Sequence, residues 1–403
     1  KPMSKILAAV EVGTSSAKAL IGELTDAKGL NVVAASSVPN EGVRKGQVVD
    51  YRKAAAAVHA ALEDAEKTAG TNVDEVYLAQ TGNHLRGNRL VGTALTAAAD
   101  DRVEDSDLAR AAEEAKRKQP VDGRSYIHHV RSPILLDGRM VDDPVGMHGS
   151  NIEIGYWAID GDDHAIKETV DIISGYGRVA LADLFISSIA SGAILAGPDL
   201  QKAGVLVVDL GAGVTDYVLY RDGHVAVTGV VPVGGDHVTG DLSMGLRIGE
   251  PYAEKIKIEH GKATVSKTDA EEEVWLIGNK TIGDRTVSRK AICDVIHARV
   301  VELFEILGKE LGDLLDPEEV AGGVLLTGGM SALPGIDVIA RKVLGLPVER
   351  AAFPDGIEGA LADPANATVL GLLHYGLRDN DRGGPVAESK GLFKKLAHLV
   401  GIN

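Results

Sequence analysis

The chain has 403 residues, of which 45% are apolar and 25% are charged. This composition is typical of a folded globular protein, and the length exceeds what a single compact core usually holds, so we expect at least two lobes. The formal net charge of -16 argues against a nucleic-acid partner, because phosphate backbones select clustered lysine and arginine. The single cysteine, Cys293, excludes an internal disulfide and is typical of a reducing compartment.

The N-terminal part of the chain is predicted to form three strands and a helix. Ile6 to Glu23 is apolar, is interrupted by an acid, a glycine and hydroxyls, and then becomes apolar again. A turn at 26–29 and a further apolar run at 30–39 complete the pattern of an antiparallel meander. An alanine-rich helix is expected from Tyr51 to Ala69, ending at Gly70.

Residues 83–162 are predicted to form a small inserted α/β unit. Two strand-like runs, 126–136 and 152–159, surround a helix expected at 107–118 with Ser106 as its N-cap. The pairs His128-His129 and Asp142-Asp143 suggest metal ligands, but neighbours on a strand point to opposite faces, so we favour an ordinary structural role. The apolar run 179–197 that follows contains Asp183 and three serines, which favours a buried core helix over a membrane span.

The second half begins with the same pattern as the first. "VLVVDLGAGVTDYVLY" (205–220) again joins two apolar runs through glycines, and a turn at 221–224 precedes a third run. Glu11 and Asp209, the acids that lead the two patterns, lie about half the chain apart. We therefore expect a duplicated architecture, with two mixed α/β lobes facing each other.

The C-terminal third is predicted to contain three more helices. The strongest periodicity runs over 289–315, and a strand with a double glycine then leads to a helix beginning near Leu333 and Pro334. A last helix over 365–375 precedes "DNDRGGPVAESK", which has the composition of a flexible linker.

The glycine-rich turns are candidates for phosphate binding, because successive backbone N–H groups can surround a phosphate where glycine lets the chain approach. The chain has no G-x-x-x-x-G-K-[ST] motif, and Gly211-Ala-Gly213 leads into a strand rather than a helix. One such turn alone favours an ordinary tight turn. Three of them, ordered along a duplicated chain, favour a phosphate site.

Three segments carry a family resemblance. "VEVGTSSAK", "VVDLGAGVTDYVLY" and "LLTGGMSALPG" resemble the phosphate-1, phosphate-2 and adenosine motifs of the actin and heat-shock ATPase superfamily. Within it the chain resembles the FtsA family of bacterial cell-division proteins, and segments such as "GVRKGQVVD", "DPVGMHGSNIEI" and "VPVGGDHVTGDL" extend the likeness over nearly the whole length. The resemblance implies a duplicated actin-like (ribonuclease H-like) ATPase fold of the α/β class, with two lobes around a nucleotide cleft and an inserted subdomain.

The resemblance also implies a division of the chain. The expected parts are subdomain 1A over 1–82, 163–196 and 352–379, the inserted subdomain 1C over 83–162, subdomain 2A over 197–230 and 321–351, subdomain 2B over 231–320, a flexible linker over 380–390 and an amphipathic membrane-targeting helix over 391–403.

The implied ligands are ATP or ADP with Mg2+. The nucleotide-binding residues implied by the family motifs are Gly13, Thr14, Ser15, Lys18, Gly211, Gly213, Thr215, Gly234, Glu254, Lys257, Gly328, Gly329 and Met330. Glu11 and Asp209 would hold the metal, mostly through water. Without the resemblance, Glu254 and Lys257 would be read as an ordinary solvated helix pair.

No catalytic residue is assigned. Residues 180–196 contain no glutamine or glutamate where actins place the group that orients the attacking water, and Asp183 is the only acid there. Glu11 also stands where many superfamily members have aspartate. We expect at most slow ATP hydrolysis, with the nucleotide acting chiefly as a conformational switch.

The closing "GLFKKLAHLVGIN" predicts a short amphipathic helix. At about 18 Å it is too short to span a bilayer but suited to lying in its surface. The pattern alone fits a helix docked on its own domain equally well, and the resemblance favours the membrane. The expected membrane-binding residues are Leu392, Phe393, Lys394, Lys395, Leu396, Leu399 and Val400.

The implied function is that of an ATP-binding protein that polymerises on the cytoplasmic face of the cell membrane at the division site and tethers the FtsZ ring. The implied partners are the FtsZ C-terminal tail, bound between about Val231 and Val320, further copies of the chain, anionic lipid and later divisome proteins. Two alternatives remain open here: a PilM-like pilus-assembly protein of the same fold, and a small-molecule kinase of the superfamily.

Overall fold

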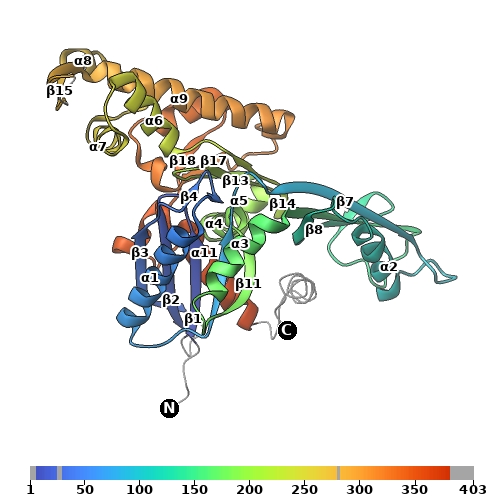
Figure 1. Ribbon diagram of the computed structural model, residues 1–403. Helices are drawn as coiled ribbons and strands as arrows, with labels where there is room; N and C mark the ends of the chain where they lie inside the picture. Colours follow the sequence, from blue (N-terminus) through green and yellow to red (C-terminus); the bar gives the residue numbers. More distant parts are fainter. Residues whose placement is uncertain (1–5, 25–29, 279–281, 382–403) are drawn as a thin grey trace.

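The computed structural model describes residues 6–24, 30–278 and 282–381. They form two lobes, each built on a five-stranded sheet, and a smaller unit that projects from them at the right of Figure 1. Within these ranges, no helix combines the length and the apolar character needed to cross a bilayer.

The first lobe is built on a sheet with the strand order β11-β6-β1-β2-β3. Strands β1, β2 and β3 form the antiparallel meander predicted from the sequence. Strand β6 pairs in parallel with β1, and β11 pairs in parallel with β6. The strands are β1 (Ile6–Val12), β2 (Ser16–Leu24), β3 (Leu30–Pro39), β6 (Glu75–Gln80) and β11 (Ala180–Ile186). The helices around this sheet are α1 (Tyr51–Ala69), α3 (Asp163–Ser174), α4 (Ser187–Leu195) and α11 (Ala367–Asp381).

The second lobe repeats this topology. Its sheet has the order β14-β13-β12-β17-β18, again with an antiparallel meander and two strands added in parallel to the first strand of the meander. The strands are β12 (Val205–Leu210), β13 (Thr215–Arg221), β14 (His224–Val231), β17 (Val324–Thr327) and β18 (Val348–Arg350). Because both sheets have the same strand order and directions, the predicted duplication is confirmed.

Helices and a small hairpin build the outer part of the second lobe. The long α9 (Arg289–Leu311) lies across its top in Figure 1, with α6 and α7 beside it. The other elements are α5 (Pro198–Ala203), α6 (Gly235–Leu246), α7 (Glu250–His260), α8 (Lys267–Glu271), β15 (Glu273–Leu276), β16 (Arg285–Ser288) and α10 (Ile336–Leu344).

The projecting unit is a four-stranded antiparallel sheet in the order β7-β10-β8-β9, covered by α2 (Asp105–Lys116). Its strands are β7 (Arg86–Leu95), β8 (Arg124–Leu136), β9 (Arg139–Val141) and β10 (Asn151–Asp162). Tyr156 and Ile154 of β10 are buried in a core of its own, against Ala111 and Ala115 of α2. The structure therefore contains the α/β unit expected in this part of the chain.

The largest error of the sequence analysis concerns residues 179–197, which do not form one helix. Residues 180–186 are strand β11, paired in parallel with β6, and only Ser187–Leu195 are helical. Periodicity alone cannot assign a short apolar run to strand or helix, and β11, the edge strand of its sheet, passes directly into α4 with no turn between them.

The boundaries of four helices also differ from the prediction, and one of these is α11, expected over 365–375 and found over Ala367–Asp381. Helix α2 begins at Asp105 after Glu104, because buried Asp107 accepts the backbone N–H of Glu104 (2.9 Å) and so lies inside the first turn instead of following a Ser106 cap. Helix α9 ends at Leu311 and continues as a 3-10 turn over Gly312–Leu315. Helix α10 begins at Ile336, after a 3-10 turn over Gly329–Ala332.

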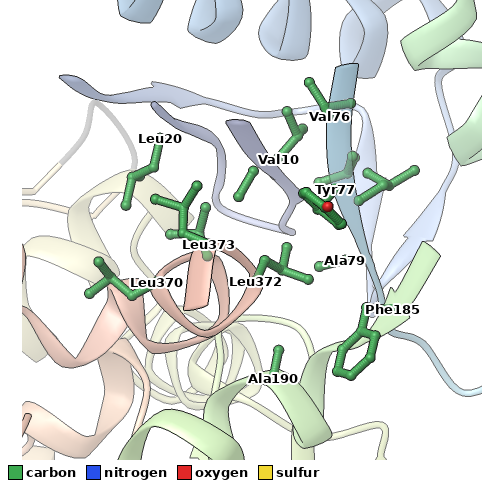
Figure 2. Packing of buried hydrophobic residues seen from close by; sticks show 14 of the residues in the cluster. Val10, Leu20, Val76, Tyr77, Ala79, Phe185, Ala190, Leu370, Leu372 and Leu373 are labelled. Carbon is green, nitrogen blue, oxygen red and sulfur yellow. The ribbon is translucent and has the colours of Figure 1, made fainter. Parts of the chain in front are cut away.

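The core of the first lobe lies between its sheet and the helices around it, α1 and α3 as well as α4 and α11. Figure 2 shows Leu370, Leu372 and Leu373 of α11 packed against the sheet beside Ala190 of α4. Leu373 is completely buried, so its side chain removes apolar surface from water over its whole area. Helix α11 thus fastens residues near the C-terminus to the first strands of the chain.

Leu373→Ala should lower the free energy of unfolding by about 2 to 5 kcal/mol, the range for truncating a buried leucine and leaving a cavity. Urea denaturation followed by circular dichroism measures this change. Val338→Ala on α10, where the valine is 48% exposed, is the control and should change stability by less than about 0.5 kcal/mol. A loss below about 1 kcal/mol for Leu373→Ala would contradict the packing of α11.

Candidate functional site

A cavity of about 890 Å³ lies between the two lobes, within the range of pockets that hold small molecules. It is lined by turns from both meanders, by α7 and by the double glycine after β17. Most of the residues expected from the family motifs line it: Glu11, Gly13, Thr14, Ser15, Lys18, Asp209, Gly211, Gly213, Glu254, Lys257, Gly328, Gly329 and Met330.

The two meander turns have the same construction. The Gly13 N–H donates to the Ser16 carbonyl (3.1 Å), and the Gly211 N–H donates to the Val214 carbonyl (3.0 Å). The turns face each other across the cavity so closely that a Cβ on Gly213 would overlap the Thr14 hydroxyl oxygen of the opposite lobe. Backbone amides from both lobes therefore meet in one place, which suits an anion with many oxygens.

Two expected residues do not line the cavity. Thr215 is completely buried, and its hydroxyl donates to the Val233 carbonyl (2.8 Å). The Gly234 N–H donates to His237 Nδ1 (3.1 Å), and it is Gly235 that reaches the cavity wall. The Thr215 side chain points away from the cavity because side chains alternate between the two faces of a strand, and its neighbours present theirs to the cavity face.

Asp216 lines the cavity but is not among the residues expected from the motifs. It follows Thr215 in β13, and both of its carboxylate oxygens accept from the Thr81 hydroxyl of the first lobe (2.7 and 2.8 Å). The available signal was the two-residue period of the strand, which places Val214 and Asp216 on one face.

The cavity gathers carboxyl groups with little compensating charge. Burial, followed by the neighbouring Glu11, raises the pKa of Asp209 to about 6, although Lys18 and the Thr368 hydroxyl (3.1 Å) act in the opposite direction. Burial, followed by Asp209, raises the pKa of Asp216 well above its usual range. A bound cation would relieve this repulsion.

The residues present fit Mg2+ as a companion of a phosphate. Among the described residues, no group of three histidine, cysteine, aspartate or glutamate side chains has the arrangement of a metal site. Mg2+ usually takes only one or two carboxylates and completes its shell with water and phosphate oxygens. Glu11 and Asp209 can serve in this way, while Lys18 pairs with Glu11 (3.3 Å) and donates to the Ala365 carbonyl.

The shifted pKa of Asp209 predicts how the stability of the empty protein depends on pH. Because the folded-state value exceeds the ordinary 3.8, this group stabilises the fold at low pH, and that contribution is lost as the pH rises through about 6. Asp209→Asn should therefore raise the melting temperature of the ligand-free protein at pH 7.5, and raise it less at pH 5. Differential scanning calorimetry with exposed Asp355→Asn as the control measures this; a lower melting temperature at pH 7.5 would contradict the burial of this charge.

The other end of the cavity is built from α7 and the double glycine. The Lys257 ammonium donates to Glu254 (2.6 Å), the Gly235 carbonyl (3.1 Å) and the Thr239 hydroxyl (3.0 Å). Only 13% of the Lys257 side chain is exposed, so it is not the ordinary solvated pair partner that the bare sequence suggested. Gly328 and Met330 form part of the cavity wall.

The N-terminus of α4 reaches the cavity through Ser187, whose hydroxyl donates to the Gln80 carbonyl (3.1 Å). Asp183 does not line the cavity and accepts from the Tyr375 hydroxyl (3.2 Å). Residues 180–196 therefore bring no carboxylate or amide side chain to the cavity.

Two lobes of one topology with a cavity between their meander turns define an actin-like fold, and solved structures agree. The chain matches the PilM–PilN type IV pilus biogenesis complex with a TM-score of 0.63 at 19% identity, covering 92% of this chain and 98% of that one. It matches MreB5 of Spiroplasma citri bound to ADP with a TM-score of 0.56 at 14% identity, covering 94% and 99%.

The chain belongs to the FtsA family of cell division proteins. It is 31% identical to the cell division protein FtsA of Neisseria meningitidis serogroup B over 98% of this chain and 97% of that protein, and 28% identical to that of Bacillus subtilis over 93% and 84%. The family model described as "Cell division protein FtsA" matches residues 206–371, and "SHS2 domain inserted in FTSA" matches residues 82–159. The predicted fold class and family are thereby confirmed, and family membership disfavours the pilus-assembly and kinase alternatives.

Proposed function

We propose that this chain is a nucleotide-binding, actin-like adaptor that polymerises on the cytoplasmic face of the cell membrane at the division site, tethers the FtsZ ring and recruits later divisome proteins. The observation that carries the nucleotide part is the pair of turns that meet across the cavity, with Thr14 of one lobe against Gly213 of the other. A polyphosphate between these turns would hold the lobes together. Membership in a family of cell division proteins supports the rest.

The proposed ligand is ATP or ADP with Mg2+. The phosphates would lie against the amides of residues 13–15 and 211–213, with Lys18 adding positive charge, and Mg2+ would sit near Glu11 and Asp209 with water in its shell. The ribose would lie beside Glu254, and the base between Lys257 and Met330. A solved structure of MreB5, which has the same fold, contains ADP.

Hydrolysis in this site should be slow. The group nearest the phosphate end on α4 is a serine, Ser187, whose hydroxyl already donates to a backbone carbonyl. Asp216 could accept a proton from water, but it is held by Thr81. We therefore propose that bound nucleotide acts mainly as a conformational switch for polymerisation.

We retain as proposals the expected subdomain boundaries and the role of 1C (83–162) in filament contacts and recruitment. The FtsZ C-terminal tail would bind subdomain 2B, between about Val231 and Val320. The expected linker at 380–390 falls almost entirely outside the described residues, and the membrane helix at 391–403 falls wholly outside them. Since one short helix binds lipid only marginally, a filament that carries many of them would bind by avidity.

Electron microscopy of the full chain on an anionic lipid monolayer with Mg2+ and ATP tests this proposal. The expected result is ordered filaments on lipid that disappear when EDTA removes Mg2+. A monomeric protein that stays off the lipid under every nucleotide condition would overturn the proposed function.

A further inference from the structure

A small hairpin, β4 (Val43–Arg44) and β5 (Gln47–Val48), lies beside the cavity without being part of either sheet. Its base is fixed to the first glycine turn by Asn40, which is 6% exposed. The Asn40 side chain donates to the Gly13 carbonyl (2.8 Å), and its backbone N–H donates to the Ser15 carbonyl (3.0 Å). The hairpin and the phosphate-1 turn are therefore held as one rigid piece.

The tip of this hairpin touches both lobes. The Gly46 N–H donates to the Thr14 hydroxyl oxygen (3.1 Å). A Cβ placed on Gly213, in the turn of the second lobe, would lie 2.9 Å from the Lys45 backbone nitrogen. The tip is thus packed directly against the place where the lobes meet.

The same tip also contacts the point where the inserted subdomain leaves the first lobe. A Cβ on Gly46 would lie 2.9 Å from the Gly82 Cα and 3.3 Å from the Val214 side chain. Gly46 and Gly82 both have positive φ angles, +70° and +128°. The backbones of Gly46 and Gly82 and the side chain of Val214 therefore meet with no room for a Cβ on Gly46, so a shift in one displaces the others.

From Gly82 the contacts continue into the inserted subdomain through His84, which is 8% exposed. Its Nδ1 accepts from the Asp162 N–H (3.3 Å), and its Nε2 lies 3.0 Å from the side-chain amide nitrogen of Gln80. The Arg124 guanidinium donates to the His84 carbonyl (2.6 Å) and pairs with Asp160. The strands that leave and re-enter the first lobe are therefore tied together at their root.

Thr14 is the chemical link between this junction and the cavity. Its hydroxyl oxygen accepts from Gly46, so its proton remains available to an acceptor in the cavity, and the two hydrogen bonds would strengthen each other. We propose that the Lys45–Gly46 turn, here called the latch, couples the nucleotide to the inserted subdomain. Thr14 binds the terminal phosphate of a nucleoside triphosphate, and the turn bonded to Thr14 then holds Gly82, at the root of the inserted subdomain, in place. This inference rests on the proposed nucleotide binding and assigns its regulation.

Amide hydrogen exchange of the full chain, saturated with Mg2+ and either ADP or the triphosphate analogue AMPPNP, tests the latch. In the wild type, residues 82–87 should exchange about fivefold or more slowly with AMPPNP than with ADP, because opening of the root then requires breaking the latch. Gly46→Ala should abolish this difference. The matched control is Gly223→Ala, since Gly223 follows Asp222 in a turn of similar φ angles and a Cβ there would meet nothing within 4 Å.

A second pair of variants keeps the test decisive if Gly46→Ala does not fold. Thr14→Val should lose the difference between AMPPNP and ADP, and Thr14→Ser, which keeps the hydroxyl, should retain it. A wild type that binds neither nucleotide would overturn the proposed function and this inference together. A wild type that binds both but shows equal exchange, or a Thr14→Val variant that keeps the difference, would overturn the latch alone.

Discussion

Asp209→Asn should weaken the binding of ATP in the presence of Mg2+ by about 100-fold or more, equivalent to ~2.7 kcal/mol. The Asp209 carboxyl lies buried in the cavity beside Glu11, where Lys18 only partly compensates the negative charge. The substitution removes the charge that would attract the cation while keeping the shape and the hydrogen bond to Thr368. Isothermal titration calorimetry with and without EDTA measures the change.

Asp209→Asn should also raise the melting temperature of the ligand-free protein at pH 7.5. A loss of ATP affinity in this variant therefore cannot be caused by unfolding. Asp363→Asn is a useful control, because Asp363 also lines the cavity but is not among the residues proposed to hold the cation, and its side chain accepts the Ala365 N–H (2.8 Å). It should change ATP affinity by less than about threefold. Unchanged affinity in Asp209→Asn would remove this residue from the metal site.

Phe393→Glu combined with Leu396→Glu should release the protein from anionic vesicles. Both residues belong to the apolar stripe expected in the C-terminal helix, and each buried apolar side chain contributes about 1.5 to 3 kcal/mol to transfer out of water. Two carboxylates on the same stripe would also be repelled by anionic lipid. Vesicle co-sedimentation should show the bound fraction falling to background.

The matched control adds the same two charges upstream of that helix, as Val386→Glu with Ala387→Glu in the expected linker. This variant should still bind vesicles, and both variants should bind ATP like the wild type. Continued co-sedimentation of the Phe393 and Leu396 variant would exclude the tail as the membrane anchor.

The parts of the fold that follow from short-range rules were predictable from the sequence. The two meanders have strands of alternating or buried pattern joined by glycine turns, and α1 begins and ends at the predicted residues because Asp50 caps it and Gly70 ends it in the left-handed region. The run at 179–197 was misread because a short apolar strand passes there directly into a helix, with no turn residue to mark the boundary, and periodicity cannot assign so short a run.

The sequence predicted the parts of the candidate site that glycine turns mark. It did not predict which side chains of the neighbouring strands face the cavity, because that depends on how the two lobes pack. Thr215 belongs to the motif, yet its side chain faces Val233, whereas Asp216 faces the cavity and meets Thr81 from the other lobe. That contact joins residues far apart in the chain, and no local pattern indicates it. The contact between Gly46 and Thr14 was equally hidden, because it depends on how a hairpin packs and not on its sequence.

A crystal structure of the chain grown with Mg2+ and AMPPNP is the most direct test of the central claim, that the two meander turns clamp a polyphosphate between the lobes. The account predicts phosphate density between residues 13–15 and 211–213, a cation beside Glu11 and Asp209, and adenine near Lys257 and Met330. Nucleotide bound elsewhere, or a cleft that remains empty at saturating ligand, would contradict it.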